Sequence, residues 1–333
     1  MSLALALAFF LFPQEVSETV TVQRAMLEAR IVDSAGRPIR DLKPSDFRAT
    51  MDKKRVDVLS VSWVSDTAVP EYDDAYLEAM AASNTLMPPE VTGRNFILLF
   101  QTDFARFTPH ISGEMAFLPY AEKIVNELPP HDRVAVFSFD SHLKFRLDLT
   151  ENRRQVRRAI QQVTLIDDPP QPPPVSEPSL AGCLDRDSMR RAATMEDALL
   201  QIARAAAEIP GRKEMFILGH GFGDQVGGQV LMEPNWEEAK SRLIAADVAV
   251  NAIYTSTAGG ALVAGLLRVT SATGGFFMSA AELKQQAVDR VSQGELSGHY
   301  ELELRPPDGT PPGPHDVQLR VKGMTYVVTI TLD

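Results

Sequence analysis

Hydrophobic and polar residues follow two different rhythms along this chain. From Thr19 to Val64, roughly alternating apolar positions are broken by turns, which predicts a small all-β unit with a hairpin around Asp52-Lys53-Lys54. From Asn95 to Val291, continuous apolar runs of strand length alternate with segments of helical spacing. Because parallel strands are buried on both faces and form unbroken apolar runs, this region predicts an α/β domain with a mostly parallel, doubly wound sheet.

The pattern also places the individual elements of this α/β region. Its predicted strands are Phe96–Phe100, Arg133–Phe139, Leu143–Leu149, Lys213–Leu218, Val248–Tyr254 and Phe276–Met278. Its predicted helices are Met115–Leu128, a helix capped by Thr150, Thr194–Ile209, Trp236–Ala246, Ala261–Ala272 and Glu282–Val291. Since Leu143–Leu149 follows the preceding strand so closely, we expect it to be an antiparallel hairpin partner. The proline-dense stretch Asp167–Pro178 predicts an extended, exposed excursion.

Strand-like runs also close the chain, at Tyr300–Leu304, Val317–Val321 and Tyr326–Leu332. Neither end alone supplies a convincing independent domain, so we expect the two ends to pair into one smaller β-sandwich-like domain beside the α/β domain. The expected organisation is a signal-like apolar segment at 1–14, an N-terminal β domain at 15–65, a linker at 66–94, an α/β domain at 95–294 and C-terminal strands at 295–333 that pack with 15–65.

Charge and cysteine content exclude several classes of function. The 333 residues carry a formal net charge of −11, which argues against a nucleic-acid partner because the phosphate backbone requires a clustered Lys/Arg surface. The nearest basic stretch, Arg153–Arg158, contains Val156 and precedes Ala159 and Ile160, so the solvated face of a helix explains it better. The single cysteine, Cys183, excludes an intramolecular disulfide and a thiolate metal cluster.

The apolar run Leu3–Phe12 matches the core of a secretory signal, although no Lys or Arg precedes it and no clear cleavage site follows. It is too short to span a bilayer, and no other segment approaches the roughly 20 apolar residues that a membrane helix needs. We therefore expect an exported, extracytoplasmic protein without a transmembrane domain, associated with the cell envelope or secreted.

Three stretches resemble the von Willebrand factor A-type (vWA) domain. Asn126–Ile160 is similar to the family stretch in which a helix ends, a strand carries a V-x-F core and an antiparallel strand closes with D-L-T. Glu208–Asp224 resembles the strand that leads into the family's third metal-site loop, and Val16–Val58 the β-rich leader of the bacterial VWFA-related subfamily, whose members are typically exported. The resemblance covers most of Val16–Asp333. It implies a Rossmann-like vWA fold and a binding function without catalysis.

The resemblance also implies a place for a metal, and the sequence departs from the family there. Most vWA domains hold Mg²⁺ in a metal-ion-dependent adhesion site, with a D-x-S-x-S loop, a Thr in a second loop and an Asp after the fourth strand. Here Gln101 stands at the Asp position, Asp103 and Ala105 at the two Ser positions, and His220 at the last Asp. Thr194 is the nearest match to the second-loop Thr, one residue out of register. An amide, an imidazole and one carboxylate suit Mg²⁺ poorly, so we expect a degenerate site and no metal cofactor.

Even without a metal, the carboxyl edge of the sheet is the expected binding surface, because ligands of open α/β sheets gather beyond the strand ends. We expect loops 102–107, 139–142, 219–224 and 255–259 there, with a protein partner whose identity the sequence does not give. Phe104 either anchors that interface or packs beneath its loop. The candidate binding residues are Gln101, Asp103, Phe104, Ala105, Thr194, His220 and Asp224.

Three alternatives stay open from the sequence. Asp103, His220 and Thr194 are unusual ligands that suit a metal-dependent adhesion domain loaded with Zn²⁺ or Mn²⁺. Ser138 or Ser141 with a nearby histidine and Asp103 is the only arrangement that favours a hydrolase, and the nucleophile elbow and phosphate-loop motifs are absent. The third alternative is a passive structural domain in a cell-envelope assembly. The main prediction has no catalytic residues.

Overall fold

The structure is a computed structural model that describes residues 24–31, 38–65, 93–102, 118, 121–122, 124–175, 177–227, 229–255, 260–279, 298–307 and 309–332, with the backbone alone for 65, 314 and 324–332. The predicted signal-like segment, nearly all of the linker at 66–94 and the helix predicted at Glu282–Val291 lie outside these residues.

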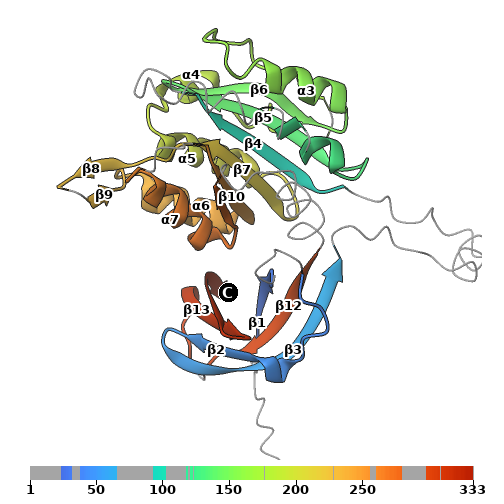
Figure 1. Cartoon of the computed structure of the whole chain (residues 1–333), viewed down its shortest axis with the longest axis vertical. Helices are drawn as coiled ribbons and strands as arrows, with labels where there is room; N and C mark the ends of the chain where they lie inside the picture. Colours follow the sequence, from blue (N-terminus) through green and yellow to red (C-terminus); the bar gives the residue numbers. More distant parts are fainter. Residues whose placement is uncertain are drawn as a thin grey trace, which may run out of the picture.

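Six strands form the sheet of the α/β domain, in the spatial order β11-β10-β7-β4-β5-β6 (Figure 1). Their bounds are β4 (Asn95–Gln101), β5 (Arg133–Phe139), β6 (Leu143–Thr150), β7 (Lys213–Gly219), β10 (Val248–Tyr254) and β11 (Phe277–Ser279). All neighbours are parallel except β6, which runs antiparallel to β5, as predicted. Counted along the chain from β4, the order is 3-2-1-4-5-6, which is that of doubly wound folds. The predicted fold class is confirmed.

Helices cover both faces of this sheet. Alternate residues of β4 enter two separate cores, with Leu99 in one and Phe100 in the other. The first core is completed by helices α4 (Arg186–Arg191), α5 (Met195–Ala206), α6 (Trp236–Ala245) and α7 (Val263–Thr273), and the second by α3 (Arg153–Gln161) and helical residues within 118–127. Burial on both faces explains why the strand is an unbroken apolar run.

Two details of the helices differ from the sequence prediction. Thr150 does not cap α3; it is the last residue of β6, and Asn152 is the cap, with its side chain accepting hydrogen bonds from the amides of Arg154 and Gln155. The short helix α4 was not predicted. In α3 the apolar residues Val156, Ala159 and Ile160 are buried, so the arginine-rich stretch is one face of an amphipathic helix, as predicted.

Strands from both ends of the chain form a second, antiparallel sheet in the order β1-β12-β3-β2-β13-β14. Their bounds are β1 (Ala25–Ala29), β2 (Phe47–Met51), β3 (Lys54–Ser65), β12 (Gly298–Arg305), β13 (Gly313–Val321) and β14 (Met324–Leu332), and a 3-10 turn at Pro44–Asp46 precedes β2. The sheet curls (Figure 1), so that its two edge strands, β1 and β14, approach each other. Tyr300 and Leu319 lie in the core that the curl encloses.

A buried ion pair joins the two sheets. Glu214, at the start of β7, accepts hydrogen bonds from Arg30 (2.6 Å), which follows β1, from Arg212 (3.1 Å) and from Asn251 (2.9 Å). Arg212 also pairs with Glu28 of β1. Complete burial opposes ionisation, but Arg30 and Arg212 outweigh it and hold the pKa of Glu214 at about 2.

Candidate functional site

The parallel strands of the α/β sheet end at one edge, and the direction in which strands are added reverses between β4 and β7. In doubly wound sheets this switch point opens the crevice where ligands bind. β4 ends at Gln101 and β7 at Gly219, so Gln101 and the turn after Gly219 face the switch point. Pairing continues past the strand ends, because the Thr255 amide donates to the Gly219 carbonyl at 2.8 Å.

Gln101 and the turn His220–Gly221 are joined by hydrogen bonds across this point. The Oε1 atom of Gln101 accepts from the backbone amides of His220 (3.1 Å) and Gly221 (3.2 Å). Its Nε2 atom donates to the Gly221 carbonyl at 2.9 Å and lies 3.1 Å from Nε2 of His220. Gln101 is 2% exposed and His220 6%, so these contacts are shielded from water. We call this arrangement the Gln101 clamp.

The backbone groups around Gln101 determine the orientation of its amide and the tautomer of His220. Two N–H groups face Oε1 and a carbonyl faces Nε2, so the amide of Gln101 has only one orientation that satisfies them. Nε2 of Gln101 must then donate to Nε2 of His220, which has to be unprotonated and accept. The histidine therefore is neutral, with its proton on Nδ1.

Two glycines let the loops approach this closely. A Cβ atom at Gly219 would collide with the side chain of Gln101, so only glycine leaves room for the amide. Gly221 has φ +108°, and its Cβ would collide with the carbonyl of Leu262. Gly219 is therefore required by the clamp, and Gly221 by its positive φ and by the close approach of Leu262.

The structure brings together two of the predicted site residues, Gln101 and His220. Asp103, Phe104 and Ala105 lie outside the described residues. Thr194 is the N-cap of α5, and its Oγ1 accepts from the Asp197 amide at 3.1 Å; among the described residues, no hydrogen bond joins it to the clamp. Within the described part of the chain, no group of three or more His, Cys, Asp or Glu side chains is arranged to hold a metal ion.

Asp224, the last predicted site residue, begins a hairpin that the sequence analysis missed. Strands β8 (Asp224–Val226) and β9 (Gln229–Leu231) pair between β7 and α6 and extend away from the carboxyl edge (Figure 1). The register puts Val226 and Leu231 on the same side of this ribbon, where they are 57% and 51% exposed. Val230, on the opposite side, is buried and anchors the hairpin. Val226 and Leu231 thus give this side of the ribbon an exposed apolar surface.

Acidic side chains gather at the base of this hairpin. Burial raises the pKa of Glu196, and the charges of Glu233 and Asp197 add to the effect. Burial also raises the pKa of Glu233, with a further contribution from Asp224. The Glu196 side chain accepts from the amide of Glu233 at 3.3 Å. Carboxyl groups, among them that of the exposed Asp224, therefore border the exposed apolar face of the hairpin.

The serines and His142 of the arrangement considered for a hydrolase are described, whereas its acidic member, Asp103, lies outside the described residues. The Ser141 hydroxyl lies 3.1 Å from Nδ1 of His142 and donates to Asp140 at 3.2 Å, so its proton has a carboxylate acceptor besides the histidine. On the other side of the ring, Asp168 is 3.9 Å from Nε2, beyond hydrogen-bond distance, and is engaged by Arg190. Ser138 is buried and accepts from Arg146 at 2.9 Å.

No protein-family model and no curated protein matches the sequence. Solved structures with a similar arrangement include a von Willebrand factor type A protein from Catenulispora acidiphila, with 9% identity over 93% of this chain and 73% of that one and a TM-score of 0.44. BatB from Bacteroides thetaiotaomicron has 14% identity over 61% and 97%, with a TM-score of 0.40. Manganese-loaded TRAP protein from Plasmodium vivax has 10% identity over 82% and 96%, with a TM-score of 0.39. Because these identities and TM-scores are low, the strand order and register of this chain are what support the assignment of a vWA-like fold.

Proposed function

We propose that this chain is an exported, non-enzymatic protein-interaction module. Its partner binds at the carboxyl edge of the α/β sheet, on the β8–β9 hairpin and the adjoining strand ends, and no metal ion takes part. The observation that carries the proposal is the projecting hairpin, whose outer face exposes Val226 and Leu231 beside the switch point. The carboxyl groups of Asp224 and Glu233 at its base favour a partner surface that is apolar with basic residues around it.

The Gln101 clamp supports a binding mode without metal. In metal-dependent vWA domains an ion joins the loops after the first and fourth strands of the sheet. Here the amide of Gln101 makes that connection directly, with both of its polar atoms occupied. An ion that used Oε1 would have to displace two backbone N–H donors, which are buried and would lose their partner.

The proposal of export rests on the apolar run Leu3–Phe12. Among the described residues, none of the helices is both apolar enough and long enough to cross a bilayer. Fractionation of cells that express the full chain tests this step, because an exported protein is found in the envelope or medium fraction, whereas accumulation in the cytoplasm would contradict it.

Site-specific photo-crosslinking tests the binding surface. One variant carries a photoreactive residue at Val226 on the hairpin, and a matched control carries it at His131, an exposed position just before β5 at the opposite edge of the same sheet. In the native envelope we expect a discrete adduct from Val226 and none from His131, with the same yield after chelation of divalent ions. Loss of the adduct on chelation would favour the metal-dependent alternative. Equal labelling from both positions, or none, would contradict the proposed surface.

A further inference from the structure

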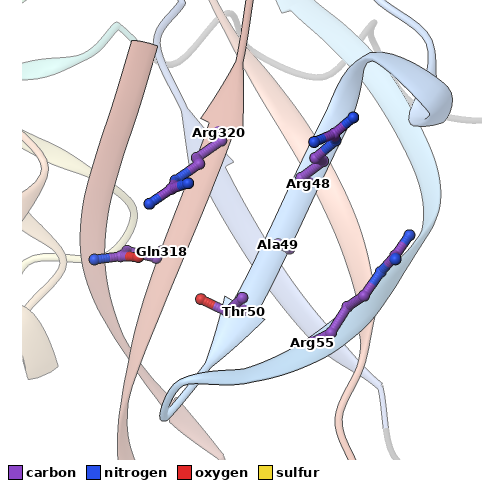
Figure 2. Close-up of a pocket in the computed structure, with 6 residues that line it drawn as sticks. All are labelled: Arg48, Ala49, Thr50, Arg55, Gln318 and Arg320. Carbon is purple, nitrogen blue, oxygen red and sulfur yellow. The ribbon is translucent and has the colours of Figure 1, made fainter. Parts of the chain in front are cut away.

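Three arginines from separate strands lie on the outer face of the curled sheet and line one cavity there (Figure 2). In the antiparallel register Arg320 of β13 lies directly opposite Arg48 of β2. One step along, Gln318 lies opposite Thr50, and Thr50 lies opposite Arg55 of β3. Because alternate residues of a strand share a face, all five side chains leave the sheet on the same side.

These residues line a shallow cavity of about 470 Å³. The intervening positions Ala49, Val317 and Leu319 point the other way and are buried in the core of the sheet. The arginines are exposed, so the cavity opens to solvent above a rigid, paired backbone.

The arginines of this cavity differ from most others in the described chain. Arg30, Arg94, Arg146 and Arg212, among others, are each paired with a carboxylate. By contrast, among the described residues no carboxylate lies within ion-pairing distance of the three guanidinium groups of the cavity. Within the described part of the chain this cluster is therefore unneutralised, although the protein as a whole carries a net charge of −11.

The strand register brings like charges together, which lowers the stability of the protein without a ligand. Arg48 and Arg320 form a cross-strand pair of like charges, and such pairs destabilise a sheet. A bound anion would reverse the sign of that interaction, because each guanidinium can donate two parallel hydrogen bonds to an oxyanion. The Thr50 hydroxyl and the Gln318 amide add neutral donors beside them.

We propose that this cavity, the Arg48–Arg55–Arg320 site, binds a phosphate group carried by a small molecule or by a lipid headgroup. A group with several oxygens and more than one negative charge can engage three guanidinium groups together, whereas a single carboxylate is satisfied by one. The site is independent of the carboxyl edge of the α/β sheet and of the partner proposed there.

The positively charged surface is small, so the ligand that fits it is compact. Asp57 follows Arg55 on the same face of β3, and Asp316 precedes Gln318 on the same face of β13. Carboxylates therefore border the cavity along both strands. A nucleic-acid strand, which requires a continuous basic track, would meet these carboxylates.

Thermal unfolding of the full chain in the presence of inorganic pyrophosphate tests the site. Titrations at constant ionic strength, with potassium chloride as the balancing salt, compare wild type with Arg48→Gln/Arg320→Gln. A control variant, Arg154→Gln/Arg158→Gln, removes the same charge from exposed positions on α3. We expect a saturable rise of the unfolding temperature in wild type and control, and an apparent affinity at least about tenfold weaker in the cavity variant.

Two further measurements test whether binding requires the guanidinium groups and which kind of molecule carries the phosphate. Arg55→Lys keeps the charge but loses the planar fork, so we expect it to weaken pyrophosphate binding without changing the circular dichroism spectrum. Sedimentation with vesicles that contain phosphatidic acid identifies the source: binding that depends on Arg48 and Arg320 indicates a lipid headgroup, and response to pyrophosphate alone indicates a soluble ligand. No saturable shift in wild type, or the same shift in the cavity variant, would overturn the proposal.

Discussion

Gln101 stands where metal-binding vWA domains have an aspartate, and two properties of its amide matter here. The amide donates as well as accepts, so it can pair with the Gly221 carbonyl and with His220 as well as with two backbone N–H groups. It is also neutral, so its burial costs far less free energy than that of a carboxylate without a cation. In the metal-free binding mode that we propose, this amide supplies the connection between the two loops.

Replacing Gln101 with glutamate tests this directly. The carboxylate would keep the two N–H donors but place its second oxygen against the Gly221 carbonyl and the unprotonated Nε2 of His220. We expect Gln101→Glu to lower the free energy of unfolding by about 1–3 kcal/mol near neutral pH, because buried acceptors lose their donor. Denaturant unfolding measures this, with Gln225→Glu, an exposed position in β8, as the control. A loss no larger than that of the control would show that the clamp does not stabilise the fold.

The tautomer of His220 is a second consequence at this scale. Nε2 accepts from Gln101, so the proton must be on Nδ1. We expect the ¹⁵N chemical shifts of the His220 ring to show a protonated Nδ1 and an unprotonated Nε2 near neutral pH. In Gln101→Ala this preference should disappear. Protonated Nε2 in the wild-type protein would contradict the amide orientation on which the clamp depends.

At the scale of elements, the turn between β7 and the β8–β9 hairpin depends on Gly221. Comparison with two glycines elsewhere, Gly182 and Gly211, separates the effect of a positive φ from the effect of steric crowding. Gly182 has open space and no positive φ; Gly211 has open space but φ +73°; Gly221 has φ +108° and would direct its Cβ into the Leu262 carbonyl. We expect alanine to be nearly neutral at Gly182, to cost about 1–2 kcal/mol at Gly211 and to cost more at Gly221. Chemical denaturation of the three variants measures this ranking, and a Gly221→Ala variant as stable as Gly211→Ala would contradict it.

The elements that sequence patterning predicted are those whose environment is uniform along their length. β10 is buried at every position and β5 at every position except Arg133, so their apolar runs were unambiguous. The β8–β9 hairpin was missed because Asp224–Val226 is exposed throughout and has no apolar periodicity. Helix α4 was missed because six residues rich in charge give no helical stripe.

The candidate site could be predicted only where it follows from the ends of strands. Gln101 and His220 were placed on one edge because parallel strands end together, and the structure brings them into contact. The Arg48–Arg55–Arg320 site could not be predicted, because its residues come from three strands and Arg320 is paired with Arg48 only through tertiary register. The burial of Glu214 likewise depends on Arg30, which is distant in sequence.

At the scale of the whole molecule, the Glu214 ion pair joins the curled sheet to the α/β sheet. The pKa of Glu214 is about 2, below its ordinary value of 4.5, so the folded state binds the proton less readily than the unfolded state. The stabilisation is fully present above pH 4.5 and is lost as the pH falls from there toward 2. The pKa difference between the unfolded and folded states corresponds to a stabilisation on the order of a few kcal/mol.

Acid unfolding checks this contribution. We expect Glu214→Gln to lower stability at neutral pH and to flatten the loss of stability between pH 5 and about 2, compared with wild type and with Glu208→Gln at an exposed position. Burial raises the pKa of Asp247, so this residue contributes to the pH dependence of stability with the opposite sign. Its contribution is common to both proteins, so the difference between Glu214→Gln and wild type isolates the contribution of Glu214. An unchanged slope in Glu214→Gln would show that another group governs the acid transition.

A metal-free binding edge requires that the Gln101 clamp occupy the place where other vWA domains hold a metal ion. Isothermal titration calorimetry of the full chain, stripped with chelator and titrated with Mg²⁺ and then Mn²⁺, measures this most directly. We expect no saturable heat up to millimolar concentrations, in wild type and in His220→Ala alike. Binding of either ion with micromolar affinity, abolished by Gln101→Ala or His220→Ala, would contradict a metal-free binding edge.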